Sequence, residues 1–560
     1  MENILPMSKL FFPFLTGILL SFIGFSQNNS SNPVMIETST SPKLVVGIVV
    51  DQMRYDYLTR FAHRYGEGGF KRLLNEGFEF KNNHFNYIPT YTGPGHASIY
   101  TGTYPAIHGV IANDWYDKEI KAEVYCVQDD NVLPVGTTHK AGKMSPHRMK
   151  TTSITDQLKL HTQQQSKVIG ISLKDRGAIL PAGHNANAAY WFHGKEEGKW
   201  ISSSFYMVQL PQWVQQFNNS EVAETYLNDT WNTLYPIETY IESGPDFSPY
   251  EAKFNGVEHS VFPYNLKSLA SENGNFDILK ETPYGNNITT DFAIAAIEGE
   301  NLGKNNTTDF LAISYSSPDY IGHTFAVNSV EVQDNYLRLD QEIEKLLKYL
   351  DANLGKQNYT LFLTADHGAV HNPGYLKSLN IPAGFFNRSE FQSKLKAYSK
   401  EIYTVDLIEK VQSNQVFLNI QALKAKTLSS EIVQQTLADF ILRYSQIDKV
   451  FTRTQLEGNL YTRDTGYLVQ NGFNQKRSGD VVYVLDPAVI STWYKNGGTT
   501  HGSGYTYDTH VPLIFFGTGI KKGHTYQKSE ITDIAPTLSA LLGIARPNGA
   551  TGKVLTELFE

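Results

Sequence analysis

Six residues in this sequence carry side chains that bind divalent metal ions, and each follows a short apolar run or lies in a loop beyond one. They are Asp51, Asp319, His323, Asp366, His367 and His501. Three carboxylates and three imidazoles suit two zinc-class cations in separate three-ligand sites, each with one open position. Two such cations roughly 4 Å apart support in-line displacement at phosphorus, because one activates the attacking oxygen and the other the leaving oxygen.

The hydroxyl of Thr92 is the candidate nucleophile. It precedes a Gly-Pro-Gly turn and a helix-compatible run, where backbone N–H groups and the helix dipole favour an anion. Taken alone, a Thr at such a position is most often an N-cap. As a nucleophile it needs direct metal coordination to lower its pKa.

Three further residues could hold the non-bridging oxygens of a phosphoryl group. Asn113 lies in the loop at residues 108–115, and Lys174 and Arg176 follow the apolar run at residues 166–173. Phosphoryl oxygens need hydrogen-bond donors and positive charge, which these side chains supply. In isolation, the Asn would be a turn residue and the two cations surface charge.

The apolar runs predict the elements that position these residues. Residues 44–50, 309–315 and the run from residue 359 up to Asp366 are short and rich in β-branched and aromatic residues, as expected for buried parallel strands. An amphipathic pattern over residues 329–350 predicts a long helix. We therefore expect an α/β fold: a doubly wound, mostly parallel central sheet with helices on both faces and inserted cap regions. Ligands bind at the carboxyl ends of the strands in such sheets.

The N-terminus has the pattern of a secretory signal peptide over residues 1–26. Lys9 precedes a largely apolar segment of 16 residues at 10–25, and translation could start at Met1 or Met7. Because a spanning helix needs roughly 20 residues, we expect no stable membrane anchor. The protein should be exported, to the periplasm or the medium.

The rest of the chain divides into a polar linker and one large domain. We place the linker at residues 27–42 and the domain at residues 43–556, with irregular insertions near residues 185–285 and 370–495. Cys126 is the only cysteine, so no intramolecular disulfide can form, and we expect a buried structural thiol. The net charge of −8 argues against nucleic-acid binding.

In their order along the chain, the motifs resemble those of the alkaline phosphatase superfamily. The matching segments are Val50-Asp51, Thr92-Gly-Pro-Gly-His96, His108-Gly-Val-Ile-Ala-Asn113, Pro318-Asp319 with His323, Ala365-Asp-His-Gly368 and Thr500-His-Gly502. Within the superfamily, the likeness is closest to the phosphate-irrepressible alkaline phosphatases of the PafA type. These are related in turn to nucleotide pyrophosphatase/phosphodiesterases.

The resemblance implies a role for each candidate residue. One Zn²⁺ would be held by Asp319, His323 and His501, and the other by Asp51, Asp366 and His367 together with Thr92. The implied activity is hydrolysis of phosphate monoesters through a phosphothreonine intermediate, which releases inorganic phosphate for phosphate acquisition. Zinc is inferred from ligand type, so Mn²⁺, Co²⁺ or an additional Ca²⁺ remains open.

Three alternatives are weighed against this interpretation. A phosphodiesterase or nucleotide pyrophosphatase would use the same bimetal site, but Lys174 and Arg176 match a Lys-x-Arg pair that the phosphodiesterase branch lacks. A sulfatase is disfavoured because Cys126 is not in a Cys-x-Pro-x-Arg setting. A secreted binding protein with structural zinc would use closed four-ligand sites. We expect a monomer whose partners are small-molecule phosphate monoesters.

Overall fold

The computed structural model describes residues 41–559. The predicted signal peptide and all but the end of the predicted linker lie outside the described residues. The described residues form one compact unit.

A ten-stranded sheet forms the centre of this unit, in the order β21-β2-β20-β13-β1-β12-β7-β8-β9-β6. Its inner strands run parallel: β13 (Tyr359–Thr364), β1 (Leu44–Val50), β12 (Asp309–Tyr315), β7 (Val168–Ser172) and β8 (Ala188–His193). All seven residues of β1 are buried, which explains its unbroken apolar sequence. The predicted α/β fold with a mostly parallel sheet is confirmed.

The outer strands of the sheet complete it in mixed directions. Strands β20 and β9 are antiparallel to their inner neighbours. The outer strands are β21 (Gly523–Thr525), β2 (Phe78–Phe80), β20 (Leu513–Gly517), β9 (Lys199–Ser203) and β6 (Pro134–Val135).

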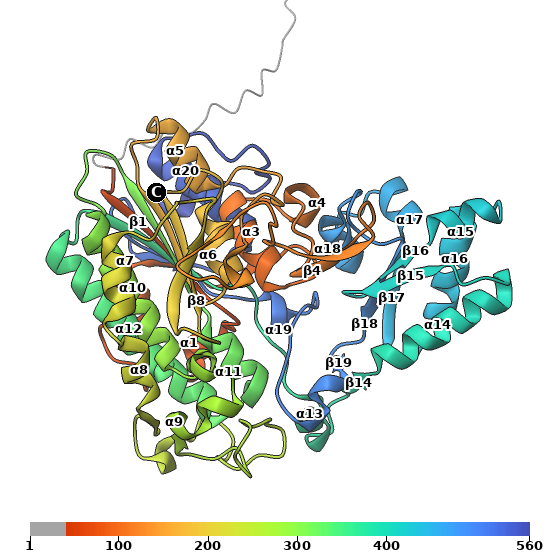
Figure 1. Cartoon of the computed structure of the whole chain (residues 1–560), viewed down its shortest axis with the longest axis horizontal. Coiled ribbons are helices and arrows are strands. Elements are labelled where there is room, and N and C mark those ends of the chain that lie inside the picture. The colour runs from red at the N-terminus through yellow and green to blue at the C-terminus, as the bar shows by residue number, and fades with distance from the viewer. Residues whose placement is uncertain (1–40, 560) are drawn as a thin grey trace, which may run out of the picture. The chain divides into compact units, whose positions relative to one another are not determined.

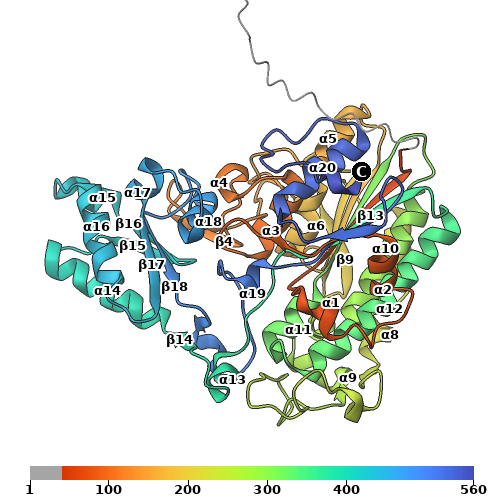
Figure 2. The same cartoon turned by 180° about the vertical axis from the view of Figure 1, so that it is seen from behind.

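Helices cover both faces of the sheet (Figures 1 and 2). One layer contains α7 (Gln212–Asn219), α10 (Tyr284–Glu300) and α12 (Val330–Asn353). The other contains α3 (Thr92–Thr101), α5 (Ile154–His161), α6 (Asp175–Ala182) and α20 (Ile534–Leu542). The predicted long helix is α12, whose N-cap Ser329 accepts a hydrogen bond from the backbone N–H of Val332. Among residues 41–559, no helix combines the length and apolar character needed to cross a membrane.

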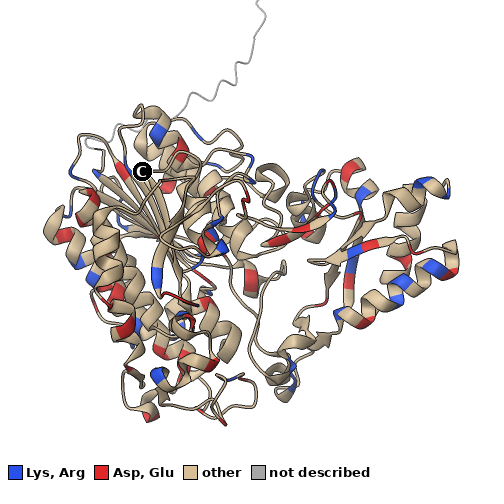
Figure 3. Ribbon diagram, viewed as in Figure 1, with Lys and Arg blue, Asp and Glu red and all other residues tan. Residues whose placement is uncertain are grey.

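The region predicted as an insertion near residues 370–495 contains a separate small sheet with its own hydrophobic core. Its strands are β15 (Ile408–Gln412), β16 (Gln415–Leu418), β18 (Val481–Leu485) and β17 (Ile447–Thr452), packed with α14 (Arg388–Tyr403) and α16 (Ser430–Ile441). We call this region the cap. In Figure 3, basic and acidic residues are intermixed along its helix α14.

The region predicted as an insertion near residues 185–285 differs from expectation at its start. Strands β8 and β9 lie there and extend the central sheet. Every residue of β8 is buried, because helices cover both of its faces. The irregular part of this region therefore begins after Ser203.

Candidate active site

The carboxyl ends of the inner strands bring the predicted residues together. Asp51 directly follows β1, Asp366 lies just beyond β13, and Asp319 lies in α11 (Ser317–Phe325), which follows β12. The parallel register pairs Val49 of β1 with residues near the ends of both β12 and β13. Residues more than 300 positions apart in the sequence therefore meet at one sheet edge.

A first group of candidate ligands surrounds the Nε2 atom of His367. Asp51 Oδ1 and Asp366 Oδ2 each lie 3.5 Å from this atom, and Thr92 Oγ1 lies 3.4 Å from it. Ligands about 2.0–2.1 Å from a tetrahedral zinc ion are separated by roughly 3.4 Å. The spacing of these atoms fits three or four ligands of one cation.

The two carboxylates of this group have oxygens without a hydrogen-bond partner. Asp51 Oδ1 and Asp366 Oδ2 belong to fully buried side chains, and neither atom accepts a hydrogen bond. Burial, together with the neighbouring Asp366 carboxylate, raises the pKa of Asp51 well above its ordinary value. Because a buried carboxylate oxygen without a hydrogen bond is costly, these two oxygens fit a cation bound between the side chains.

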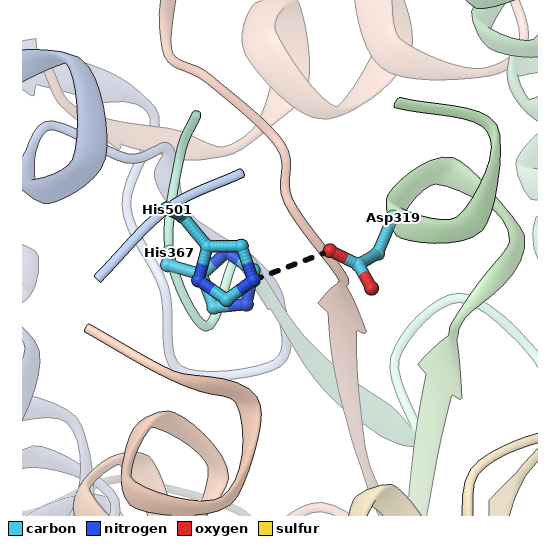
Figure 4. A group of neighbouring side chains, drawn as sticks. All are labelled: Asp319, His367 and His501. Atoms are coloured by element: carbon cyan, nitrogen blue, oxygen red, sulfur yellow. Dashed lines mark ion pairs between the residues drawn. The ribbon is translucent and has the colours of Figure 1, made fainter. Parts of the chain in front are cut away.

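A second group is centred on Asp319 (Figure 4). Its Oδ1 atom lies 3.2 Å from His323 Nε2 and 3.6 Å from His501 Nε2. The ring of His367 stacks on that of His501 with centroids 3.4 Å apart, so His367 lies close to both groups. Burial alone would raise the pKa of Asp319, but His323 and Lys174 outweigh it and hold the pKa well below its ordinary value.

Backbone carbonyl groups orient all three histidines. The Nδ1 atoms of His323, His367 and His501 lie 2.7, 3.1 and 2.7 Å from the carbonyl oxygens of Thr499, Gly368 and Thr90. Since a carbonyl oxygen can only accept, each Nδ1 carries the proton. Each Nε2 lone pair is then free to bind a metal ion, which is the usual arrangement of histidine ligands.

Lys174 lies between the two groups. Its Nζ atom is 2.7 Å from Asp51 Oδ2 and 2.5 Å from Asp319 Oδ2. Burial alone would lower the pKa of Lys174, but the two carboxylates outweigh it and raise the pKa. The ammonium group is therefore charged and within reach of any group held between the two ligand sets.

Thr92 is the first residue of α3 rather than the residue before it, and the remaining predicted residues lie next to this helix, Asn113 at Gly93 and Arg176 in α6, which packs on α3. Asn113 Oδ1 accepts a hydrogen bond of 2.7 Å from the backbone N–H of Gly93, which leaves its amide NH₂ available as a donor. Arg176 donates from Nη1 to the hydroxyl of Tyr125 at 3.0 Å, and its buried Nε–H has no partner. Both side chains therefore retain donors for an oxyanion.

Sequence reasoning missed three residues that support these side chains. Gln52 donates from its side chain to Asp319 Oδ1 at 2.6 Å and from its backbone to Asp366 Oδ1 at 3.2 Å. His96 Nδ1 lies 3.3 Å from Asp366 Oδ2, and the ring of Tyr320 lies 4.9 Å from Lys174 Nζ. Their only sequence signal is proximity to a ligand or to Thr92.

A cavity of about 330 Å³ opens between the cap and the candidate site. Tyr91 and His501 on the side of the candidate site and Arg388, Tyr483 and Trp493 of the cap are among the residues that line it. A group bonded to a phosphoryl group near Thr92 would have space here.

Comparison with known proteins identifies relatives over nearly the whole chain. The type I phosphodiesterase / nucleotide pyrophosphatase family matches residues 45–509. A Myroides odoratus protein named calcium-transporting ATPase is 46% identical, over 94% of this chain and 96% of its own length. The alkaline phosphatase PhoV of Synechococcus elongatus is 45% identical, over 94% of each chain.

A solved structure agrees with these relationships. The crystal structure of wild-type alkaline phosphatase PafA is 42% identical, covers 93% of this chain and 99% of its own, and superposes with a TM-score of 0.89. The chain therefore belongs to the type I phosphodiesterase / nucleotide pyrophosphatase family, in the group that includes the PhoV and PafA alkaline phosphatases.

Proposed function

We propose that this protein is an alkaline phosphatase that hydrolyses phosphate monoesters and releases inorganic phosphate. The observation that carries the proposal is the position of the Thr92 hydroxyl, 3.4 Å from His367 Nε2 and beside two unpaired buried carboxylate oxygens. The similarity to PhoV and PafA supports the same reaction class.

Two Zn²⁺ ions fit the donor set. Asp51, Asp366, His367 and Thr92 would hold one, while Asp319, His323 and His501 would hold the other. When bound, such ions lower the pKa of a coordinated hydroxyl and stabilise negative charge on the leaving oxygen. For the first ion, the fit rests on the convergence of Asp51, Asp366 and His367 and on the two carboxylate oxygens without a hydrogen bond. For the second, it rests on the distances of His323 and His501 from Asp319 Oδ1. The ligand atoms that converge around Asp319 are those of His501 and His367, not that of His323.

The protein's own groups perform the displacement. The deprotonated Thr92 Oγ1 attacks phosphorus, and the bond to the leaving alkoxide breaks as the phosphothreonine forms. Water then attacks the phosphothreonine, and Thr92 Oγ1 departs with release of phosphate. Because Thr92 is the first residue of α3, the positive end of the helix dipole lies at the nucleophile and favours the negatively charged phosphoryl group.

Asn113, Lys174 and Arg176 hold the non-bridging oxygens in this proposal. The amide NH₂ of Asn113 and the guanidinium of Arg176 donate hydrogen bonds, and Lys174 supplies a positive charge. A monoester carries two negative charges on phosphorus near neutral pH, whereas a diester carries one. Two cationic side chains therefore favour the monoester over the diester alternative.

We also propose that the protein is exported through residues 1–26 and acts in the periplasm or the medium as a monomer. The motivating pattern is Lys9 followed by the apolar residues 10–25. N-terminal sequencing of protein from the exported fraction should begin after Ser26, and an intact leader there would contradict export by cleavage.

The decisive experiment compares phosphate compounds on purified protein with measured zinc content. An aryl phosphate monoester should be cleaved far faster than a bis-aryl phosphate diester. ATP belongs in the panel, because its terminal phosphoryl group is also doubly charged and one relative carries the name of an ATPase. A higher rate on the diester would assign the protein to the phosphodiesterases instead.

A further inference from the structure

A further group of metal-binding side chains lies outside the candidate active site, in the turn between β8 and β9. His193 is the last residue of β8, and Glu196 and Glu197 follow in the turn. One ligand atom from each of the three lies within 4.8 Å of the others. None of these residues contributes to the two groups at the sheet edge described above.

The distances within this group fit a single small cation. His193 Nε2 lies 3.3 Å from Glu197 Oε2 and 3.9 Å from Glu196 Oε2. Ligands of a tetrahedral ion with bonds of about 2.0–2.1 Å are separated by roughly 3.4 Å. The side chains therefore have the spacing of ligands around one ion without rearrangement of the backbone.

Two atoms of the group are buried and lack a hydrogen-bond partner. His193 is only 6% exposed, and its Nε2 atom is unpaired even though a carboxylate is nearby. Glu197 Oε2 is likewise buried and unpaired. The two atoms lie within ion-pair distance of each other, 3.3 Å apart, yet no hydrogen bond joins them, and a cation bound by both would satisfy each.

Neighbouring residues hold the group in this arrangement. Thr137 Oγ1 donates to Glu197 Oε1 at 2.7 Å, which leaves Oε2 as the free oxygen. The ring of His139 stacks on that of His193 with centroids 4.8 Å apart. His139 is not itself a ligand, because its Nδ1 accepts from the backbone N–H of Ala141 and its Nε2 therefore carries the proton. Such supporting contacts are typical of metal ligands.

We propose that His193, Glu196 and Glu197 form a third metal site, which takes a zinc-class divalent cation. One imidazole and two carboxylates are a donor set that suits Zn²⁺ or Mn²⁺. The Glu196 side chain is 55% exposed, so water completes the coordination and the ion exchanges with solvent. The bound ion links the turn to the end of β8 and stabilises the hairpin of β8 and β9.

The test counts zinc on matched variants of the full-length protein. Protein stripped with a chelator is dialysed against Zn²⁺, passed through a desalting column and analysed by mass spectrometry for metal and by amino-acid analysis for protein. The test variant is Glu196→Gln with Glu197→Gln, which keeps side-chain size and an acceptor for Thr137. The control is Glu258→Gln with Glu272→Gln, which removes the same charge from two exposed glutamates.

Wild-type and control proteins should each bind one more equivalent of zinc than the test variant. Zinc should also raise the melting temperature of the wild type more than that of the test variant. Equal zinc content in all three proteins would overturn the third site. The difference in zinc content between the variants does not depend on how many ions the active site binds. Failure of the proposed function would be seen in a separate measurement, as the absence of monoester turnover in the wild type.

Discussion

Replacement of Lys174 by Met separates two roles of this side chain, as a counter-ion in the metal-free protein and as a contact for the substrate. Its Nζ atom lies within 2.7 Å of Asp51 and 2.5 Å of Asp319, which are 0% and 3% exposed. Water cannot replace the ammonium group at these carboxylates. Lys174→Met should therefore lower the free energy of unfolding of the metal-free protein by about 3–5 kcal/mol, the usual cost of removing one partner from a buried ion pair.

Zinc should suppress most of this loss. With cations bound to Asp51 and Asp319, their charges are compensated without Lys174, and we expect the loss to fall to about 1 kcal/mol, as for a weakly coupled pair. Turnover should not recover, because removal of one donor to a transition-state oxyanion costs roughly 10²- to 10³-fold in rate. Zinc would thus restore stability and leave monoester hydrolysis impaired.

Urea titrations with and without saturating zinc measure the effect, with the unfolding midpoint compared at constant slope. Lys159→Met is the matched control, because Lys159 is also buried but donates only to two backbone carbonyl groups and an Asn side chain. Its loss should be the same with and without zinc. If Lys174→Met also loses equal stability in both conditions, Asp51 and Asp319 do not bind metal ions and the proposed centre is refuted.

Three further changes test other parts of the structure. Thr92→Ala should retain wild-type zinc content but lose monoester turnover by roughly 10³-fold or more, whereas Thr92→Ser, which keeps a hydroxyl, should remain active. Equal activity of the two variants would show that Thr92 is not the nucleophile. Burial lowers the pKa of His108 to about 3, so between pH 7 and pH 5 the unfolded chain takes up a proton at this residue that the folded protein does not. The folded protein is therefore destabilised on acidification below the unfolded pKa of about 6.5, by about 2 kcal/mol at pH 5. Urea titrations of His108→Gln at pH 7 and pH 5 should lack this loss. The same change of unfolding free energy with pH in His108→Gln and the wild type would contradict the prediction. Gly95→Ala would place a methyl group 2.4 Å from the backbone oxygen of Asp366 and should reduce zinc content and turnover together, while Gly458→Ala, which meets open space, should change neither; unaffected zinc content in Gly95→Ala would show that α3 can move away from Asp366.

The strands and most ligands were predictable because their signals are local. Strand β1 is an unbroken apolar run that ends in Asp51, and the polar residue is evident against its neighbours. In contrast, the sequence places β8 in an insertion, because the stretch from about residue 185 is rich in aromatic residues, Asn and Gly and does not continue the strand–helix alternation before it. Its place in the sheet depends on pairing with β7, which is a contact between separate segments.

The supporting residues could not be predicted, because their roles depend on distances between segments. The side chain of Gln52 reaches Asp319, 267 positions away, and no pattern around it in the sequence indicates this contact. The same holds for the position of Lys174 between two carboxylates and for the stacking of His367 on His501.

The sequence by itself determined which residues are able to bind metal ions and phosphate, and that they follow buried strands, because side-chain chemistry and apolar runs are properties of the chain alone. Tertiary structure decided which oxygen and nitrogen atoms face one another, that His367 lies close to both ligand groups, and that His193, Glu196 and Glu197 converge in a separate turn. The physical reason is that a metal site is defined by separations of about 3–4 Å between ligand atoms. Such separations arise only when strand pairing and helix packing bring distant segments together.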